Sequence, residues 1–283
     1  MDRGVAFSRV EDADTLPACF EDEPPSFRGR WRKLACYAAL LCCNQIAWIS
    51  YATVPADSAK VLGVSPALVT LLAASYSILY LPGSVLAARA LHRGGLRCCL
   101  LESARLMVAG TLLKVAGTVV VVVAPAPGAR ALAYALSLFG QVLLASAQPH
   151  LVNTPTAVAQ AFFPAAERDF AGILGLLGPV VGQALGEALA PAVVCGVQQR
   201  GGSAAAGLLT LNILQLFPLS VAAVLAANLF SGNAARKPSK QGASLFADWW
   251  RLVRSDANLR TLWVAVCVGM SIFNALLAMA AQW

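Results

Sequence analysis

The chain of 283 residues is 58% hydrophobic and 12% charged, and its formal net charge is +7. A soluble domain needs about a quarter of its residues charged to be well solvated, so this composition excludes an ordinary water-soluble protein. It does not indicate a nucleic-acid-binding protein either. The basic residues lie in the links between apolar runs, without interleaved aromatic residues or zinc-ligand spacing.

Apolar runs long enough to cross a membrane, which takes about 20 residues, follow a polar tail at 1–33. We predict six spans, at 34–54, 66–88, 98–124, 130–151, 170–194 and 205–230. A basic link at 231–260 comes next, and a seventh apolar run occupies 261–283. Within the link, the helical spacing of apolar residues at 245–254 predicts an amphipathic helix on the membrane surface. The predicted fold class is all-α: a polytopic transmembrane bundle of six helices over 34–230, followed by a seventh span.

Lysine and arginine are unequally divided between the two sides of this predicted bundle. Sixteen of them lie in the tail and in the links on the same side, against three on the other side: Lys60, Arg130 and Arg200. Positive residues resist translocation. We therefore expect an integral, multi-pass protein of the plasma membrane or an internal membrane, with the lipid bilayer as its partner and its amino terminus in the cytoplasm.

The titratable and nucleophilic residues form no catalytic or metal-binding pattern. Most of the eight cysteines lie in apolar runs, the two histidines are far apart at 92 and 150, and no carboxylates pair at a membrane boundary. We therefore expect no enzyme activity, no metal and no cofactor.

Two charged residues lie inside predicted spans, Lys114 near the middle of the third and Glu187 in the fifth. A lone ammonium in hydrocarbon is costly, so Lys114 should face the protein interior, with Glu187 as its candidate partner. Snorkelling of the lysine towards the interface is the alternative. Gln183 lies one turn before Glu187.

The layout resembles the major facilitator superfamily, whose transporters have two six-helix halves, each built from inverted three-helix repeats. In the stretch 88–97, Arg93, Gly95 and Arg97 match that superfamily's loop between the second and third helices, although His92 replaces the usual acidic residue. The resemblance gives this loop a role in conformational change. Gly178, Pro179 and Gly182 resemble the Gly-Pro-x-x-Gly motif of the fifth helix, which implies close helix packing.

A narrower resemblance is to the feline leukaemia virus subgroup C receptor-related family of heme and choline transporter-like proteins. It covers roughly 30–230 and rests on the order and spacing of stretches at 44–51, 91–97, 140–141, 147–149 and 155–168. The resemblance implies transport of a small organic solute: an organic cation, a choline-like or a heme-related substrate. The fourth span lacks the internal arginine that many proton-coupled relatives carry, so we expect facilitated transport, such as uniport. Our candidate substrate contacts are Trp48, Asn44, Gln45, Gln148 and Gln183; the glutamine contact of the choline-handling relatives corresponds to Val180 here.

Trp48 is the residue with the clearest physical rationale, since an indole face attracts quaternary ammonium. An interfacial belt tryptophan is the alternative. The resemblance also implies about twelve spans in a complete transporter, whereas seven are predicted here. A truncated, non-transporting protein that associates with or regulates a full-length relative is therefore the second hypothesis. Under this second hypothesis, the partner is the full-length relative. Under the transport hypothesis, the partner is the missing carboxy-terminal half.

Overall fold

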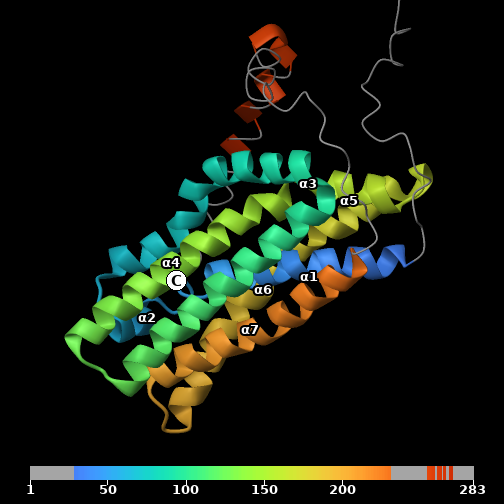
Figure 1. Cartoon of the computed structure of the whole chain (residues 1–283). Helices are drawn as coiled ribbons and strands as arrows, with labels where there is room; N and C mark the ends of the chain where they lie inside the picture. The colour runs from blue at the N-terminus through green and yellow to red at the C-terminus, as the bar shows by residue number, and fades with distance from the viewer. Residues whose placement is uncertain (1–28, 231–253, 259, 263, 266–267, 270–283) are drawn as a thin grey trace, which may run out of the picture.

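The computed structural model describes residues 29–230, 254–258, 260–262, 264–265 and 268–269. From residue 30 to residue 229 its elements are all helical: α1 (Arg30–Ile49), α2 (Pro55–Leu62), α3 (Pro66–Val123), α4 (Pro127–Val152), α5 (Pro155–Phe162), the 3-10 turn η2 (Ala165–Glu167), α6 (Arg168–Gln199) and α7 (Ala204–Leu229). The long helices lie side by side in an elongated bundle (Figure 1). No strand occurs among the described residues, and the all-α class is confirmed for them.

Four helical segments are long and apolar enough to cross a membrane: α3, α4, α6 with its preceding turn, and α7. With 58 residues, α3 is much longer than the roughly 20 residues that one crossing takes. Its backbone leaves helical geometry at Gly95, where φ is 68° and ψ is −172°, and Figure 1 shows α3 folding back on itself. We call 66–94 the first arm and 96–123 the second arm. The described helices therefore support an integral membrane protein.

The predicted spans fall on α1, the two arms of α3, α4, α6 and α7 in that order. The division into six spans, a link and a seventh span stays a prediction, as does the orientation in the membrane. The surface helix at 245–254 falls almost wholly outside the described residues. So do most of the tail and most of the seventh span.

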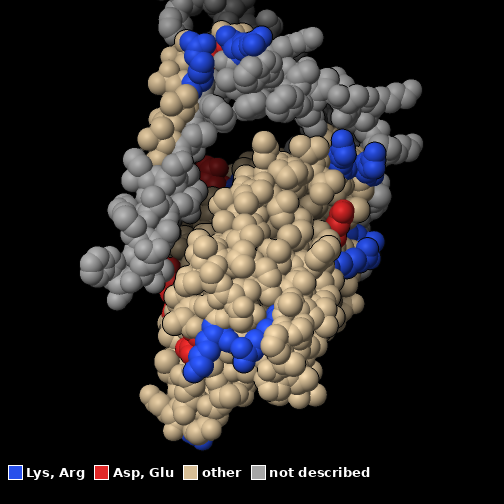
Figure 2. Space-filling view, turned by 90° about the vertical axis from the view of Figure 1, so that its left-hand side faces the viewer, with Lys and Arg blue, Asp and Glu red and all other residues tan. Residues whose placement is uncertain are grey.

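The surface agrees with a membrane setting. Figure 2 shows a wide uncharged band on one face of the bundle, with the Lys and Arg side chains of that face gathered above and below it. On the long helices, large apolar side chains such as Leu81, Phe139 and Phe217 are more than 65% exposed. Apolar exposure of this kind is expected where lipid covers the protein.

Inside the bundle, α3 packs along α4, α1 packs along α6, and α7 contacts α1, α3 and α6. Glycines bring α1 and α6 close together. A Cβ on Gly178 would lie 2.7 Å from the carbonyl oxygen of Ala38, and a Cβ on Gly182 would overlap the backbone of Cys42. The structure thus places Gly178 and Gly182 in a backbone-to-backbone contact, and Pro179 lies within α6 without interrupting it.

Candidate intramembrane binding site

Trp48 lies near the end of α1 and faces the first arm of α3. Its Nε1 donates a hydrogen bond to the carbonyl oxygen of Ala73 (3.1 Å), and its ring lies 5.9 Å from the ring of Tyr76. Belt tryptophans sit at the headgroup level, whereas this indole is half-buried and directs its N–H into the bundle. An aromatic pair inside the membrane-length helices is a setting in which a cation can rest on a ring face.

The two buried amides Asn44 and Gln141 join α1 to α4 by reciprocal hydrogen bonds. Asn44 Nδ2 donates to the carbonyl oxygen of Leu144 (3.1 Å), and Gln141 Nε2 donates to the carbonyl oxygen of Ala47 (3.5 Å). We call this pair of bonds the amide clamp. Asn44 stays a predicted substrate contact: one hydrogen of its amide nitrogen bonds to α4, and its Oδ1 has no hydrogen-bond partner among the described residues. Gln45 is buried on the same helix.

Lys114, on the second arm of α3, is fully buried. Its Nζ donates to Ser50 Oγ (2.9 Å), to the carbonyl oxygen of Ala47 (3.2 Å) and to Gln215 Oε1 (3.4 Å), and it lies 4.7 Å from the ring centre of Tyr51. Ala47 and Ser50 form the carboxyl-terminal end of α1, where the helix dipole is negative. The ammonium therefore caps α1 from inside the bundle and does not snorkel.

The structure does not form the ion pair anticipated between Lys114 and Glu187. The oxygens around Lys114 come from α1 and α7, while Glu187 is exposed on α6 and accepts a hydrogen bond from Gln183 (3.4 Å). The reason is helix geometry. Gly182 and Gly186 face α1, and the next residue, Glu187, is turned about 100° away from that face.

The remaining predicted residues are spread over the bundle. Gln148 is half-buried on α4, and Gln183 and Glu187 lie on the outer side of α6, so these residues and Trp48 come from different faces of the described helices. Arg93 and Arg97 flank the bend of α3 at Gly95, the residue whose positive φ glycine accommodates without strain. The structure thus joins the amide clamp to Lys114 and its oxygens, because Gln141 and Lys114 both donate to the carbonyl oxygen of Ala47, and it places Trp48 against Tyr76.

Sequence reasoning missed Gln141, Ser50 and Gln215 as members of this interior polar cluster. Each was visible as an isolated polar residue within or beside a long apolar run. A polar group buried in such a setting needs a hydrogen-bond partner. That requirement flags the residue, but it does not name the partner.

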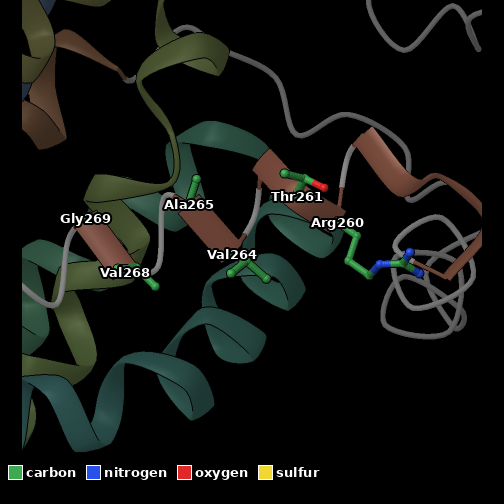
Figure 3. Close-up of a pocket in the computed structure, with 6 residues that line it drawn as sticks. All are labelled: Arg260, Thr261, Val264, Ala265, Val268 and Gly269. Carbon is green, nitrogen blue, oxygen red and sulfur yellow. The ribbon is translucent and has the colours of Figure 1, made fainter.

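Two hollows on the surface of the described residues are alternative candidate sites. The larger, of about 680 Å³, is lined by residues of a single stretch: Arg260, Thr261, Val264, Ala265, Val268 and Gly269. Their side chains point in different directions and do not converge on one point (Figure 3). The other, of about 290 Å³, lies between the α2–α3 link and the start of α4, where Arg130 and Tyr134 line it. No group of three or more His, Cys, Asp or Glu suited to a metal ion occurs among the residues described.

No protein-family model matches the chain. Over 259 residues, 87% of the chain, the sequence is 30% identical to solute carrier family 49 member A3 of Danio rerio, and the match covers 50% of that protein. It is 29% identical over 175 residues to the choline/ethanolamine transporter flvcr2a of Danio rerio, covering 62% of the chain and 35% of that protein. It is 24% identical over 173 residues to the choline/ethanolamine transporter FLVCR2 of Homo sapiens, covering 61% of the chain and 31% of that protein.

The chain therefore spans about half of the first of these relatives and about a third of the others. All three are named as carriers or transporters. Their names agree with the expectation that the chain is not an enzyme, and they agree with the resemblance found in the sequence.

Proposed function

We propose that the chain forms the amino-terminal part of a facilitative membrane transporter of the major facilitator type, related to the solute carrier 49 and FLVCR2 proteins. The observation that carries the proposal is the 30% identity to a solute carrier over 87% of the chain. Membrane-length apolar helices over the same region support it.

The proposed substrate is a small organic cation of the amino-alcohol kind, to which choline and ethanolamine belong. The ring pair of Trp48 and Tyr76 supports this class, because an aromatic face attracts a desolvated cation. Glu187, exposed on α6 at the depth of the predicted span, would attract a cation towards the bundle. The ammonium group of the buried Lys114 lies at the end of α1 and donates hydrogen bonds to oxygens there.

A heme-related substrate has less support than the organic cation. His150 is buried in α4 and its Nδ1 lies 3.0 Å from the carbonyl oxygen of Ser146, so that nitrogen is engaged within its own helix. Facilitated movement is proposed over proton coupling because the centre of α4 carries the neutral amide of Gln141.

In this superfamily the substrate lies between the two halves, near the midplane of the bilayer. We therefore propose that helices beyond those described here complete the path, and that the 283-residue chain alone moves little substrate. The alternative of a non-transporting partner gains no separate support from the similarities, because these fall on transporters.

The test is uptake into liposomes of radiolabelled choline and ethanolamine. Two preparations are compared: the chain alone, and the chain followed by a second half taken from a full-length relative. We expect saturable, proton-independent uptake from the second and little from the first. Absence of uptake from a folded two-half protein would contradict transport. Stable co-purification of the chain with a full-length relative, with a change in that relative's uptake, would favour the regulatory alternative.

A further inference from the structure

The first arm of α3 has two different outward faces. Thr70, Ser77, Tyr80 and Ser84 recur at intervals of seven, three and four residues, which places them within an arc of about 80°. The face roughly 100° further round carries the exposed apolar side chains of Leu71, Ile78 and Val85. Thr70, Ser77 and Tyr80 are exposed as well.

On the first face, polar side chains of two helices bond to one another. Tyr80 Oη donates to Asn153 Oδ1 (2.9 Å), Asn153 Nδ2 donates to Ser84 Oγ (3.2 Å), and Ser84 Oγ donates to the carbonyl oxygen of Tyr80 (2.8 Å). We call these three residues the tyrosine–asparagine cluster. Asn153 directly follows α4, and a close approach brings it within reach, because a Cβ on Gly83 would lie 3.0 Å from Cγ of Pro149.

Within the cluster, most hydrogen-bond donors are used and most of the remaining capacity is acceptor capacity. The hydroxyl hydrogens of Tyr80 and Ser84 and one amide hydrogen of Asn153 are used inside it. What is left facing outwards is mainly acceptor capacity, on the phenol oxygen and on the amide oxygen. Such a surface suits a ligand that brings its own hydrogen-bond donor. Asn153 lies just beyond the predicted span 130–151, so water can reach the cluster from that end.

The cluster also lies beside the aromatic pair of the proposed site. Tyr80 is four residues beyond Tyr76, about 6 Å along the helix axis, and Tyr76 packs against Trp48. This spacing allows a small amino alcohol whose cationic end rests on Trp48 to extend its hydroxyl end towards Tyr80.

From these observations we propose that the tyrosine–asparagine cluster is a substrate subsite that accepts a hydrogen bond from the hydroxyl of an amino-alcohol cation, on a face of α3 that lines a water-filled path. The proposal rests on the proposed transport function and adds to it a residue pair that selects for the hydroxyl group.

The first experiment tests water access without any transport. Ser77→Cys and Ile78→Cys are compared in membranes, in a background where the exposed Cys98 and Cys195 are replaced by serine. A membrane-impermeant, positively charged thiol reagent should label position 77 and leave position 78 unlabelled, and choline should slow the labelling of position 77. Equal labelling at both positions, or labelling of position 78 alone, overturns the assigned path.

The second experiment compares choline with tetramethylammonium, which has the same charged group and no hydroxyl. In the two-half protein, Tyr80→Phe should weaken choline binding by about two- to ten-fold, the range for one lost neutral hydrogen bond, and leave tetramethylammonium binding unchanged. Tyr134→Phe is the matched control, because Tyr134 Oη bonds to the carbonyl oxygen of Leu68 (3.0 Å) at the other end of the same two helices. Asn153→Ala should repeat the selective loss, which covers the case in which Tyr80→Phe does not fold.

The outcomes separate the subsite from the transport function. If both cluster variants weaken the binding of choline and tetramethylammonium equally, or weaken the binding of neither, the cluster only ties α3 to α4. The subsite is then refuted, while the transport function stands. If the unmodified protein binds neither cation, the proposed function fails and the subsite with it.

Discussion

Replacing Lys114 by methionine removes a buried charge and three hydrogen bonds while nearly keeping the side-chain volume. The loss of stability is smaller than the loss of three hydrogen bonds suggests. Ser50 Oγ still donates to the carbonyl oxygen of Ala47, and Gln141 still donates to that same oxygen. Only Gln215 Oε1 loses its hydrogen-bond donor, at a cost of about 1–3 kcal/mol for an unsatisfied buried acceptor. Removing the ammonium relieves a desolvation penalty of several kcal/mol, so we expect Lys114→Met to lower the free energy of unfolding by no more than about 2 kcal/mol.

Lys114→Ala should be worse than Lys114→Met, because it also leaves a cavity, which for large-to-alanine changes costs about 2–5 kcal/mol. The double variant with Glu187→Gln should show a coupling energy below about 0.5 kcal/mol, since the two residues share no partner. A cycle with Ser50→Ala serves as the positive control and should show more, because Ser50 Oγ bonds directly to Lys114 Nζ. The measurement is thermal unfolding of purified protein in one detergent. A coupling above about 1 kcal/mol between positions 114 and 187, or a methionine variant less stable than the alanine variant, would refute this reasoning.

Three further predictions concern other parts of the bundle. Trp48→Ala should weaken binding of a quaternary ammonium by roughly three- to thirty-fold and Trp48→Phe by less. Equal affinities of the unmodified protein and both variants, at matched surface expression, would indicate that Trp48 is an interfacial belt residue. Gly182→Val should destabilise the protein strongly, because α1 backbone occupies the space, whereas Gly196→Val on the same helix meets nothing within 4 Å and should be tolerated, as unfolding temperatures will show. Cysteines placed at 60 and 240 should label from outside and inside the cell respectively, and the opposite pattern would reverse the predicted topology.

The helical class and the approximate places of the long helices were predictable because apolar runs of membrane length have few other structures open to them. Helix ends were less predictable. A loop was expected at 89–97, yet α3 remains helical on both sides of Gly95. Hydropathy marks where the membrane ends, and Arg89, Arg93 and Arg97 continue the helix beyond it, because arginine is a good helix former.

The short helix α2 went unpredicted although it carries local signals. Pro55 occupies its first turn and Gly63 follows its end with a φ of 67°, the pattern of proline at the start and glycine just past the end. This pattern is sufficient to predict α2 from the sequence. The partners of Lys114 could not be predicted in this way, because Ser50 and Gln215 lie 64 and 101 positions away in the chain. Nothing local at Lys114 indicates which helices will lie opposite, so only the need for a partner could be predicted.

The amide clamp would have a mechanical consequence in a transporter of the proposed kind, whose helices tilt during transport. Residues 44 and 47 of α1 meet residues 144 and 141 of α4, so exchanging the two helices maps one bond onto the other, as a local two-fold axis would. When two helices tilt against each other about such an axis, each atom moves in proportion to its distance from it. Atoms at the clamp would then move least, and a helix end ten residues away, about 15 Å along the axis, would move furthest. If the proposed transport involves a tilt that opens one end of the bundle and closes the other, Asn44 and Gln141 would therefore keep their bonds and mark the point about which the two helices turn.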